Sequence, residues 1–207
     1  MSWGALTKAH QREMDEVIRL LRGAADQGCA DAQFNLGSMF HQGHDVKQDY
    51  GEAKRWYIMA AKQGEFEAQV NLGSMNEHGQ GMKQDNVEAV RWYREAANQG
   101  DCKAQSNLGL MYVRGSGVKQ DYGEAARWWR KAAEQGHSNA QLNLGVVYHQ
   151  GCGVKQDYGE AARWYRKAAE QGDGDAQVSL GTMYDEGQSV KQDNVEAAWW
   201  WRMEVKS

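Results

Sequence analysis

The chain has 207 residues with a net charge of −4 at pH 7 and a pI of about 5.9, and 41% of its residues are hydrophobic. This acidic balance excludes a dominant electrostatic attraction to nucleic acid or to an anionic membrane, because both require an excess of basic residues. The sequence contains no apolar run of about 18 residues and no basic-then-apolar leader, so it predicts neither a membrane-spanning helix nor a secretory signal. We therefore expect a cytoplasmic protein, with export open only if the natural N-terminus has been removed.

The three cysteines indicate a reducing compartment. Cys29, Cys102 and Cys152 are odd in number. They also occupy three different positions of the repeat described next, which does not fit a disulfide framework.

One sequence pattern recurs along the chain with a period of 36 residues. Ala-Gln begins at 32, 68, 104, 140 and 176, and Lys-Gln-Asp begins at 47, 83, 119, 155 and 191. A fixed period between about 20 and 50 residues is typical of a solenoid, in which stacked neighbours bury the apolar faces that a single unit leaves exposed. Each copy must fit the same kind of neighbour, which explains why residues 118–136 and 154–172 are almost identical.

From the N-terminus, the pattern divides the chain into a half-repeat and five repeats. Residues 16–28 match the second half of a repeat, with Leu20 and Leu21 in place of a Trp-Tyr pair. We expect residues 1–28 to form an N-terminal half-repeat or cap, in which residues 1–12 are an irregular extension. The full repeats are predicted at 29–64, 65–100, 101–136, 137–172 and 173–207, within a single solenoid domain.

Each repeat is predicted to contain two helices. In the repeat 137–172, apolar residues at helical spacing form two groups: Ala140, Leu144 and Val147, and then Ala161, Trp164 and Ala168. Asp157 stands before the second helix and Glu160 follows three residues later. We expect a capping box, in which Asp157 accepts from backbone N–H groups and Glu160 reaches back. The second helix is expected to end at Gly172, which can adopt the left-handed conformation of a C-terminal cap.

A glycine lies inside each first helix, at 37, 73, 109, 145 and 181. Glycine there costs about 1 kcal/mol relative to alanine, so we expect a close approach of the partner helix. The residues predicted to fill the space between the backbones are Trp56, Trp92, Trp128, Trp164 and Trp200. An aromatic stripe can also stack on nucleic acid bases, but regular recurrence on an inward face and the acidic pI favour a structural role.

The last repeat differs in its aromatic residues. Trp199 and Trp201 flank Trp200, and position 199 is arginine in every earlier repeat. These residues either seal the terminal core, which is the interpretation we favour, or mark a self-association patch on a chain otherwise expected to be a monomer.

The segment AQLNLGVVYHQGCGVKQDYGEAARWYRKAAEQG, residues 140–172, carries a set of short motifs in a fixed order. They are Ala-Gln, Leu-Gly, a tyrosine, a glycine-bounded loop, Gln-Asp-Tyr, Glu-Ala, Trp-Tyr and Ala-Ala-Glu-Gln-Gly. This order closely resembles the Sel1-like repeat, a relative of the tetratricopeptide repeat, over residues 13–207. The resemblance implies an all-α fold, an α/α superhelical solenoid of five 36-residue helix-turn-helix repeats with an N-terminal half-repeat. It also implies a scaffold or adaptor for other proteins, often in bacteria.

The positions of the first helices that vary between repeats define a candidate binding surface. They follow one another in steps of three or four, so they share one face of the helix. By resemblance to the tetratricopeptide array, this face lines a concave groove that binds a protein or peptide, and its asparagines are expected to hydrogen-bond an extended peptide backbone. The predicted partner-binding residues, called the first-helix stripe below, are Asp31, Phe34, Asn35, Ser38, His41, Glu67, Val70, Asn71, Ser74, Lys103, Asn107, Leu110, Val113, Arg114, Leu142, Asn143, Val146 and His149.

The alternative is that these positions are unconstrained and solvated. The apolar residues Phe34, Leu110 and Val146 favour binding instead. Only Lys103 and Arg114 are basic in the stripe, so a mixed apolar and polar partner is expected rather than an acidic C-terminal tail, which needs several cations.

The sequence contains only weak signals for catalysis, metals or cofactors. Cysteine-rich proteins of the resembled family have been linked to β-lactam hydrolysis, and Ser116-Gly-Val-Lys119 matches Ser-x-x-Lys. However, the companion motifs of a penicillin-recognising enzyme are missing, so we expect no enzyme and no catalytic residue. His41-x-x-His44 and His149-x-x-Cys152 lie three repeats apart and cannot share an ion, so no metal site and no cofactor are expected.

Overall fold

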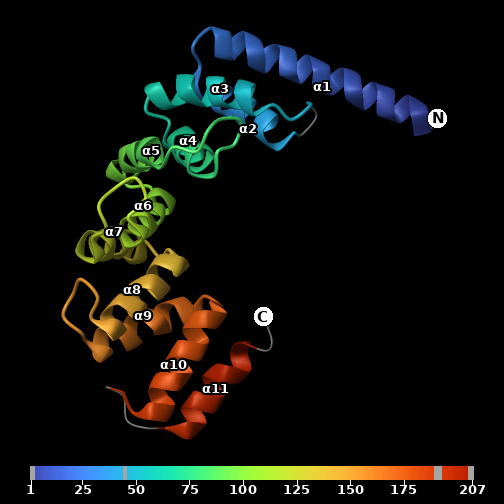
Figure 1. Cartoon of the computed structure of the whole chain (residues 1–207). Helices are drawn as coiled ribbons and strands as arrows, with labels where there is room; N and C mark the ends of the chain where they lie inside the picture. The colour runs from blue at the N-terminus through green and yellow to red at the C-terminus, as the bar shows by residue number, and fades with distance from the viewer. Residues whose placement is uncertain (1–2, 44–45, 189–192, 205–207) are drawn as a thin grey trace. The chain divides into compact units, whose positions relative to one another are not determined.

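The computed structural model describes the backbone of residues 3–43, 46–188 and 193–204, and the side chains of residues 15–43, 46–188 and 193–202. These residues form eleven α-helices and no strand, labelled in Figure 1. The all-α class and the helix-turn-helix repeats predicted from the sequence are therefore confirmed. The helices are α1 (Trp3–Asp26), α2 (Ala30–Gln42), α3 (Tyr50–Lys62), α4 (Phe66–His78), α5 (Asn86–Asn98), α6 (Cys102–Arg114), α7 (Tyr122–Glu134), α8 (Ser138–Gln150), α9 (Tyr158–Glu170), α10 (Gly174–Glu186) and α11 (Asn194–Glu204).

The chain forms two compact units, Met1–Gln99 with α1 to α5 and Gly100–Ser207 with α6 to α11. Within a unit, the two helices of each repeat are antiparallel neighbours. In the repeat 29–64, for example, the Asp49 N–H donates to the Phe40 carbonyl across the loop at 2.9 Å. The amide of Gln63, at the far end of the second helix, reaches Gln33 near the start of the first.

The hydrophobic core is shared between neighbouring repeats, as a solenoid requires. Each layer combines the second helix of one repeat with the first helix and one tryptophan of the next. In unit 1 one such layer contains Ala53, Tyr57, Ala60, Ala61, Ala68, Leu72, Met75 and Trp92. In unit 2 the matching layer contains Ala161, Ala162, Tyr165, Ala168, Ala169, Ala176, Leu180, Met183 and Trp200.

The helical glycines do mark a close approach, but the predicted partner was wrong. A Cβ atom placed on Gly145 would lie 2.6 Å from Cδ1 and Cε1 of Tyr165, the residue after Trp164. An aromatic residue at the same repeat position covers the glycine in both units. It is Tyr57 against Gly37 in unit 1 and Trp129 against Gly109 in unit 2. The tryptophan before it faces the preceding repeat instead. Adjacent residues of a helix point about 100° apart, so the two aromatic side chains serve different neighbours.

The second helices begin at the predicted aspartates, but the capping box forms only in part. Oδ1 of Asp157 accepts the Glu160 N–H at 3.0 Å, as expected. Glu160 does not reach back, because its carboxylate binds Arg163 and the indole of Trp164. The N–H of Asp157 donates instead to the carbonyl of Tyr148, at 3.0 Å, in the first helix. The C-terminal prediction is confirmed, since Gly172 has a φ of 89° directly after α9 and its C-cap residue.

The glutamine of each Ala-Gln pair is buried, and Gln141 shows how it joins three helices, whereas Oε1 of Gln177 in the last repeat has no partner among the described residues. Nε2 of Gln141 donates to the Ala133 carbonyl at 3.1 Å, and its Oε1 accepts from Gln171 at 2.7 Å. Ala133 lies in the last turn of α7, and its carbonyl also accepts the Gly136 N–H at 3.0 Å. Gln69 does the same in unit 1, with Ala61 and Gln99. Sequence reasoning used this dipeptide only to find the period.

The N-terminal extension is not irregular. Residues 3–26 form one helix of 24 residues, so the prediction for residues 1–12 is wrong wherever the structure describes them. The sequence from Ala5 to Arg22 contains neither glycine nor proline, which leaves nothing to stop the helix. The last turns of α1 behave as a second helix, because Ala25 packs with Leu36 and Trp56 and its carbonyl accepts from Gln33.

The extra tryptophans of the last repeat take two different positions. Trp201 lies against Gly181 in the place that Tyr165 occupies in the repeat before. Trp199 is 48% exposed and meets Trp200 edge-on at 4.5 Å between ring centroids. It replaces an arginine that in the repeat before, as Arg163, lies over the tryptophan ring at 5.4 Å.

Candidate functional site

The first-helix stripe lies on a face of the first helices that does not form the buried core. Five of its residues are exposed, and the others are half-buried. The exposed residues are Asp31, Asn35, Glu67, Lys103 and Arg114. The half-buried residues are Phe34, Ser38, His41, Val70, Asn71, Ser74, Asn107, Leu110, Val113, Leu142, Asn143, Val146 and His149.

In unit 1 the stripe is supported from behind by Tyr57. The Phe34 ring lies 5.9 Å from the Tyr57 ring, and the Tyr57 hydroxyl donates to Ser38 Oγ at 3.1 Å. Burial raises the pKa of Tyr57, while hydrogen bonds with Ser38 and Asn71 act in the opposite direction. The phenol therefore stays neutral and fixes two polar members of the stripe from below.

In unit 2 the stripe is more apolar. Leu110 and Val113 of α6 pack against the core layer that contains Trp129, and Leu142 and Val146 of α8 pack against the layer that contains Tyr165. Leu110 and Val146 occupy the same repeat position, 36 residues apart. Each is half-buried, so part of its side chain remains open to a partner.

The two histidines of the stripe make the same contacts in different units. His149 Nε2 lies 2.8 Å from Oε1 of Gln188 in the loop of the next repeat, and its ring meets Tyr158 at 5.2 Å. His41 reaches Gln80 in the same way, at 2.9 Å. Both side chains therefore link neighbouring repeats at the edge of the stripe.

The residues proposed for chemistry do not form a site in the described part of the chain. Ser116 and Lys119 lie in the loop after α6, so Ser116 does not open a helix as the nucleophile motif requires. His44 lies outside the described residues. Among the residues that are described, no group of three or more His, Cys, Asp or Glu side chains is arranged to hold a metal ion, and Cys29, Cys102 and Cys152 are free thiols.

Sequence reasoning missed a row of arginine–tyrosine pairs in unit 2. Arg130 donates to the Tyr148 hydroxyl, and Arg166 donates to that of Tyr184 at 2.6 Å. Each pair joins the second helix of one repeat to the first helix of the next. The sequence does contain a signal for these pairs, because an arginine is followed by a tyrosine 18 residues later in successive repeats.

The repeat is identified by comparison with known proteins. The family model of the Sel1 repeat matches residues 30–65, 66–101, 102–137, 138–173 and 174–203. The chain belongs to the Sel1 repeat family. Sel1 repeat proteins are in general protein-interaction scaffolds.

Solved structures place this Sel1 repeat protein beside bacterial relatives. A protective antigen of uropathogenic Escherichia coli strains, described as displaying an SLR fold, is 40% identical with a TM-score of 0.88, over 90% of this chain and 40% of the antigen. This chain thus spans well under half of that antigen. A Sel1 repeat protein from Oxalobacter formigenes is 36% identical with a TM-score of 0.87, over 98% of this chain and 84% of the relative.

A more distant structural relative is the cysteine rich protein B of Helicobacter pylori, 25% identical with a TM-score of 0.51, over 65% of this chain and 96% of that protein. No curated protein matches the chain. Within the described residues, none of the helices has the length and apolar character needed to cross a bilayer.

Proposed function

We propose that this Sel1 repeat protein is a non-enzymatic scaffold that binds a peptide or a folded protein through the first-helix stripe. The observation that carries the proposal is the set of half-buried apolar side chains at matching positions of α6 and α8, with Leu110 and Val146 as the central pair. A position that only needs to be solvated has no reason to hold leucine or valine in successive repeats.

The polar residues around this pair suggest what the partner presents. In unit 1 the exposed charged residues of the stripe are Asp31 and Glu67, and in unit 2 they are Lys103 and Arg114. A partner segment that complements the unit 2 stripe combines apolar with acidic residues, whereas one that complements the unit 1 stripe carries basic residues. Electrostatic complementarity of this kind favours correct orientation and faster association more than affinity.

The test compares partner capture by a variant with charges inside the stripe and a variant with a charge outside it. Leu110→Glu combined with Val146→Glu introduces two charges into the stripe, whereas Val87→Glu introduces one at a 67% exposed position at the start of α5. Proteins captured from a lysate of the native organism are quantified by mass spectrometry, and each candidate is then purified and titrated against the variants. We expect the double variant to lose its direct partner and Val87→Glu to retain it. If a purified partner binds the wild-type chain, the double variant and Val87→Glu with equal affinity, the stripe assignment is contradicted.

A further inference from the structure

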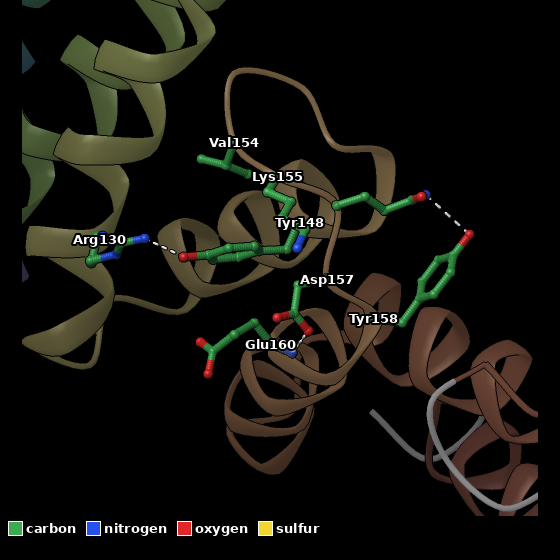
Figure 2. A pocket seen from close by; sticks show the side chains of 8 residues that line it. Arg130, Tyr148, Val154, Lys155, Asp157, Tyr158 and Glu160 are labelled. Carbon is green, nitrogen blue, oxygen red and sulfur yellow. Dashed lines mark hydrogen bonds between the residues drawn. The ribbon is translucent and has the colours of Figure 1, made fainter.

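A cavity of about 560 Å³ opens in unit 2 between α7, α8 and the start of α9, and borders the first-helix stripe where His149 contacts Tyr158. Figure 2 shows Arg130 extending from α7 to the hydroxyl of Tyr148, with Val154 and Lys155 on the loop that follows α8. None of the stripe residues lines this cavity. The lining residues are Arg130, Tyr148, Val154, Lys155, Gln156, Asp157, Tyr158 and Glu160.

The two acidic residues of the lining already have partners. Asp157 accepts the Glu160 N–H as the N-cap of α9, at 3.0 Å. Glu160 forms an ion pair with Arg163 at 3.1 Å and accepts from the indole of Trp164 at 3.1 Å. Their negative charge is therefore partly compensated within α9 itself.

The two basic residues of the lining lack such partners. Arg130 donates to the neutral hydroxyl of Tyr148 and lies 5.8 Å from the centroid of its ring. Among the described residues, neither Arg130 nor Lys155 pairs with a carboxylate. The charge of this cavity that remains available to a ligand is positive.

The repeat itself does not require this arrangement. A smaller cavity, of about 240 Å³, partly overlaps the same repeat position in unit 1, where Ile58 and Asn76 stand in the places of Arg130 and Tyr148. The fold thus accepts other residues at both positions. The Arg130–Tyr148 pair links neighbouring repeats, as Arg166 and Tyr184 do, and it also places a cation at the cavity.

We propose that the unit 2 cavity binds an aspartate or glutamate side chain of a partner peptide between Arg130 and Lys155, with an adjacent apolar residue against Val154 and the Tyr148 ring. Arginine and lysine are the donors that bind carboxylates most strongly. A carboxylate fits better than a phosphate group, because Asp157 and Glu160 line the same cavity and repel the second charge of a phosphate. This site adjoins the stripe at His149 but shares none of its residues and has a different preference.

The experiment uses the full chain and three short fluorescent peptides that also carry a photo-crosslinking group. The peptides share one sequence of glycine and serine around a Leu-Glu-Leu centre, in which the central residue is Glu, Gln or phosphoserine. Affinity is measured by fluorescence anisotropy, and cross-links are mapped by mass spectrometry. We expect the Glu peptide to bind up to about fivefold more tightly than the Gln peptide, which is the scale expected for partly exposed charge pairs. We also expect it to cross-link within residues 148–160.

Matched variants distinguish binding in this cavity from binding at the stripe or at other surface arginines. Arg130→Ile, which copies position 58, and Lys155→Gln are each expected to weaken the Glu peptide to the level of the Gln peptide. Arg127→Gln removes an exposed arginine from the same helix, one that is paired with Glu124, and is expected to change nothing. Leu110→Glu with Val146→Glu tests independence, since loss of the stripe must leave this binding intact.

Each of three results with the Glu and Gln peptides overturns the proposal. They are equal binding of the Glu and Gln peptides, unchanged affinity of Arg130→Ile, and cross-links that map only outside residues 148–160. Tighter binding of the phosphoserine peptide than of the Glu peptide also overturns it, in favour of a phosphate site. As a control, thermal unfolding followed by circular dichroism is used to check that each variant is folded.

Discussion

Replacing Gly145 by alanine tests the contact on which the pairing of helices within a repeat depends. In a helix interior, alanine is normally more stable than glycine by about 1 kcal/mol. Here the new Cβ would lie 2.6 Å from two ring carbons of Tyr165, far inside the separation of about 3.5–4.0 Å at which carbon atoms pack. Tyr165 is itself buried and cannot move aside freely. Overpacking of this kind costs up to about 3 kcal/mol, so we expect a net loss of about 2 kcal/mol.

The assay is urea unfolding followed by circular dichroism, with thermal unfolding as a second measure. A loss of about 2 kcal/mol corresponds to a fall in Tm of roughly 4–8 °C for a chain of this size. Gly23→Ala is the matched control, because no atom lies within 4 Å of a Cβ there and the same substitution is expected to stabilise. In a Tyr165→Ala background, Gly145→Ala is expected to become stabilising too. Equal effects of Gly145→Ala in both backgrounds would refute the contact argument, because residues that do not interact give additive changes.

Four further predictions concern buried or capping groups. Burial raises the pKa of Tyr165 to about 12, so the stability that its neutral phenol contributes is present below pH 10 and is lost as the pH rises from 10 to 12. Tyr165→Phe should remove this fall in the free energy of unfolding between pH 10 and 12. Burial lowers the pKa of His137, the N-cap of α8, so the free energy of unfolding should fall as the pH drops below 6.5. When unfolding is measured by urea titration, His137→Asp should remove this pH dependence between pH 5 and 7. Gln141→Met removes one of the two donors to the Ala133 carbonyl, which keeps the Gly136 N–H, and removes the Gln141 acceptor of the Gln171 amide. It should cost about 1–3 kcal/mol in the same assay, and no measurable loss would contradict the buried hydrogen bonds. Asp121→Ala should cost about 1 kcal/mol through loss of the N-cap of α7, whereas Asp121→Asn should retain most of it.

The candidate sites differ in how far they could be predicted from the sequence. The first-helix stripe follows from helical spacing and from variation between copies, because residues three or four apart share one face whatever surrounds them. The cavity at Arg130 does not follow in this way. It is formed by a second helix, the next first helix and a loop, and only their packing brings Arg130 to Tyr148.

The amino-acid sequence alone was enough to predict the period, the two helices of each repeat, their aspartate and glycine ends and the family. These features depend on residues close in the sequence and recur in every repeat, so each repeat supports the interpretation of the others. Tertiary packing selected which aromatic residue covers each glycine, because Trp164 and Tyr165 are both large and apolar and differ only in the neighbour they face. Packing also pairs the N–H of Asp157 with the first helix rather than with Glu160, since a carbonyl from another segment satisfies the same donor. These contacts form between different helices, and the spacing of residues along one helix does not show which residues of another helix they meet.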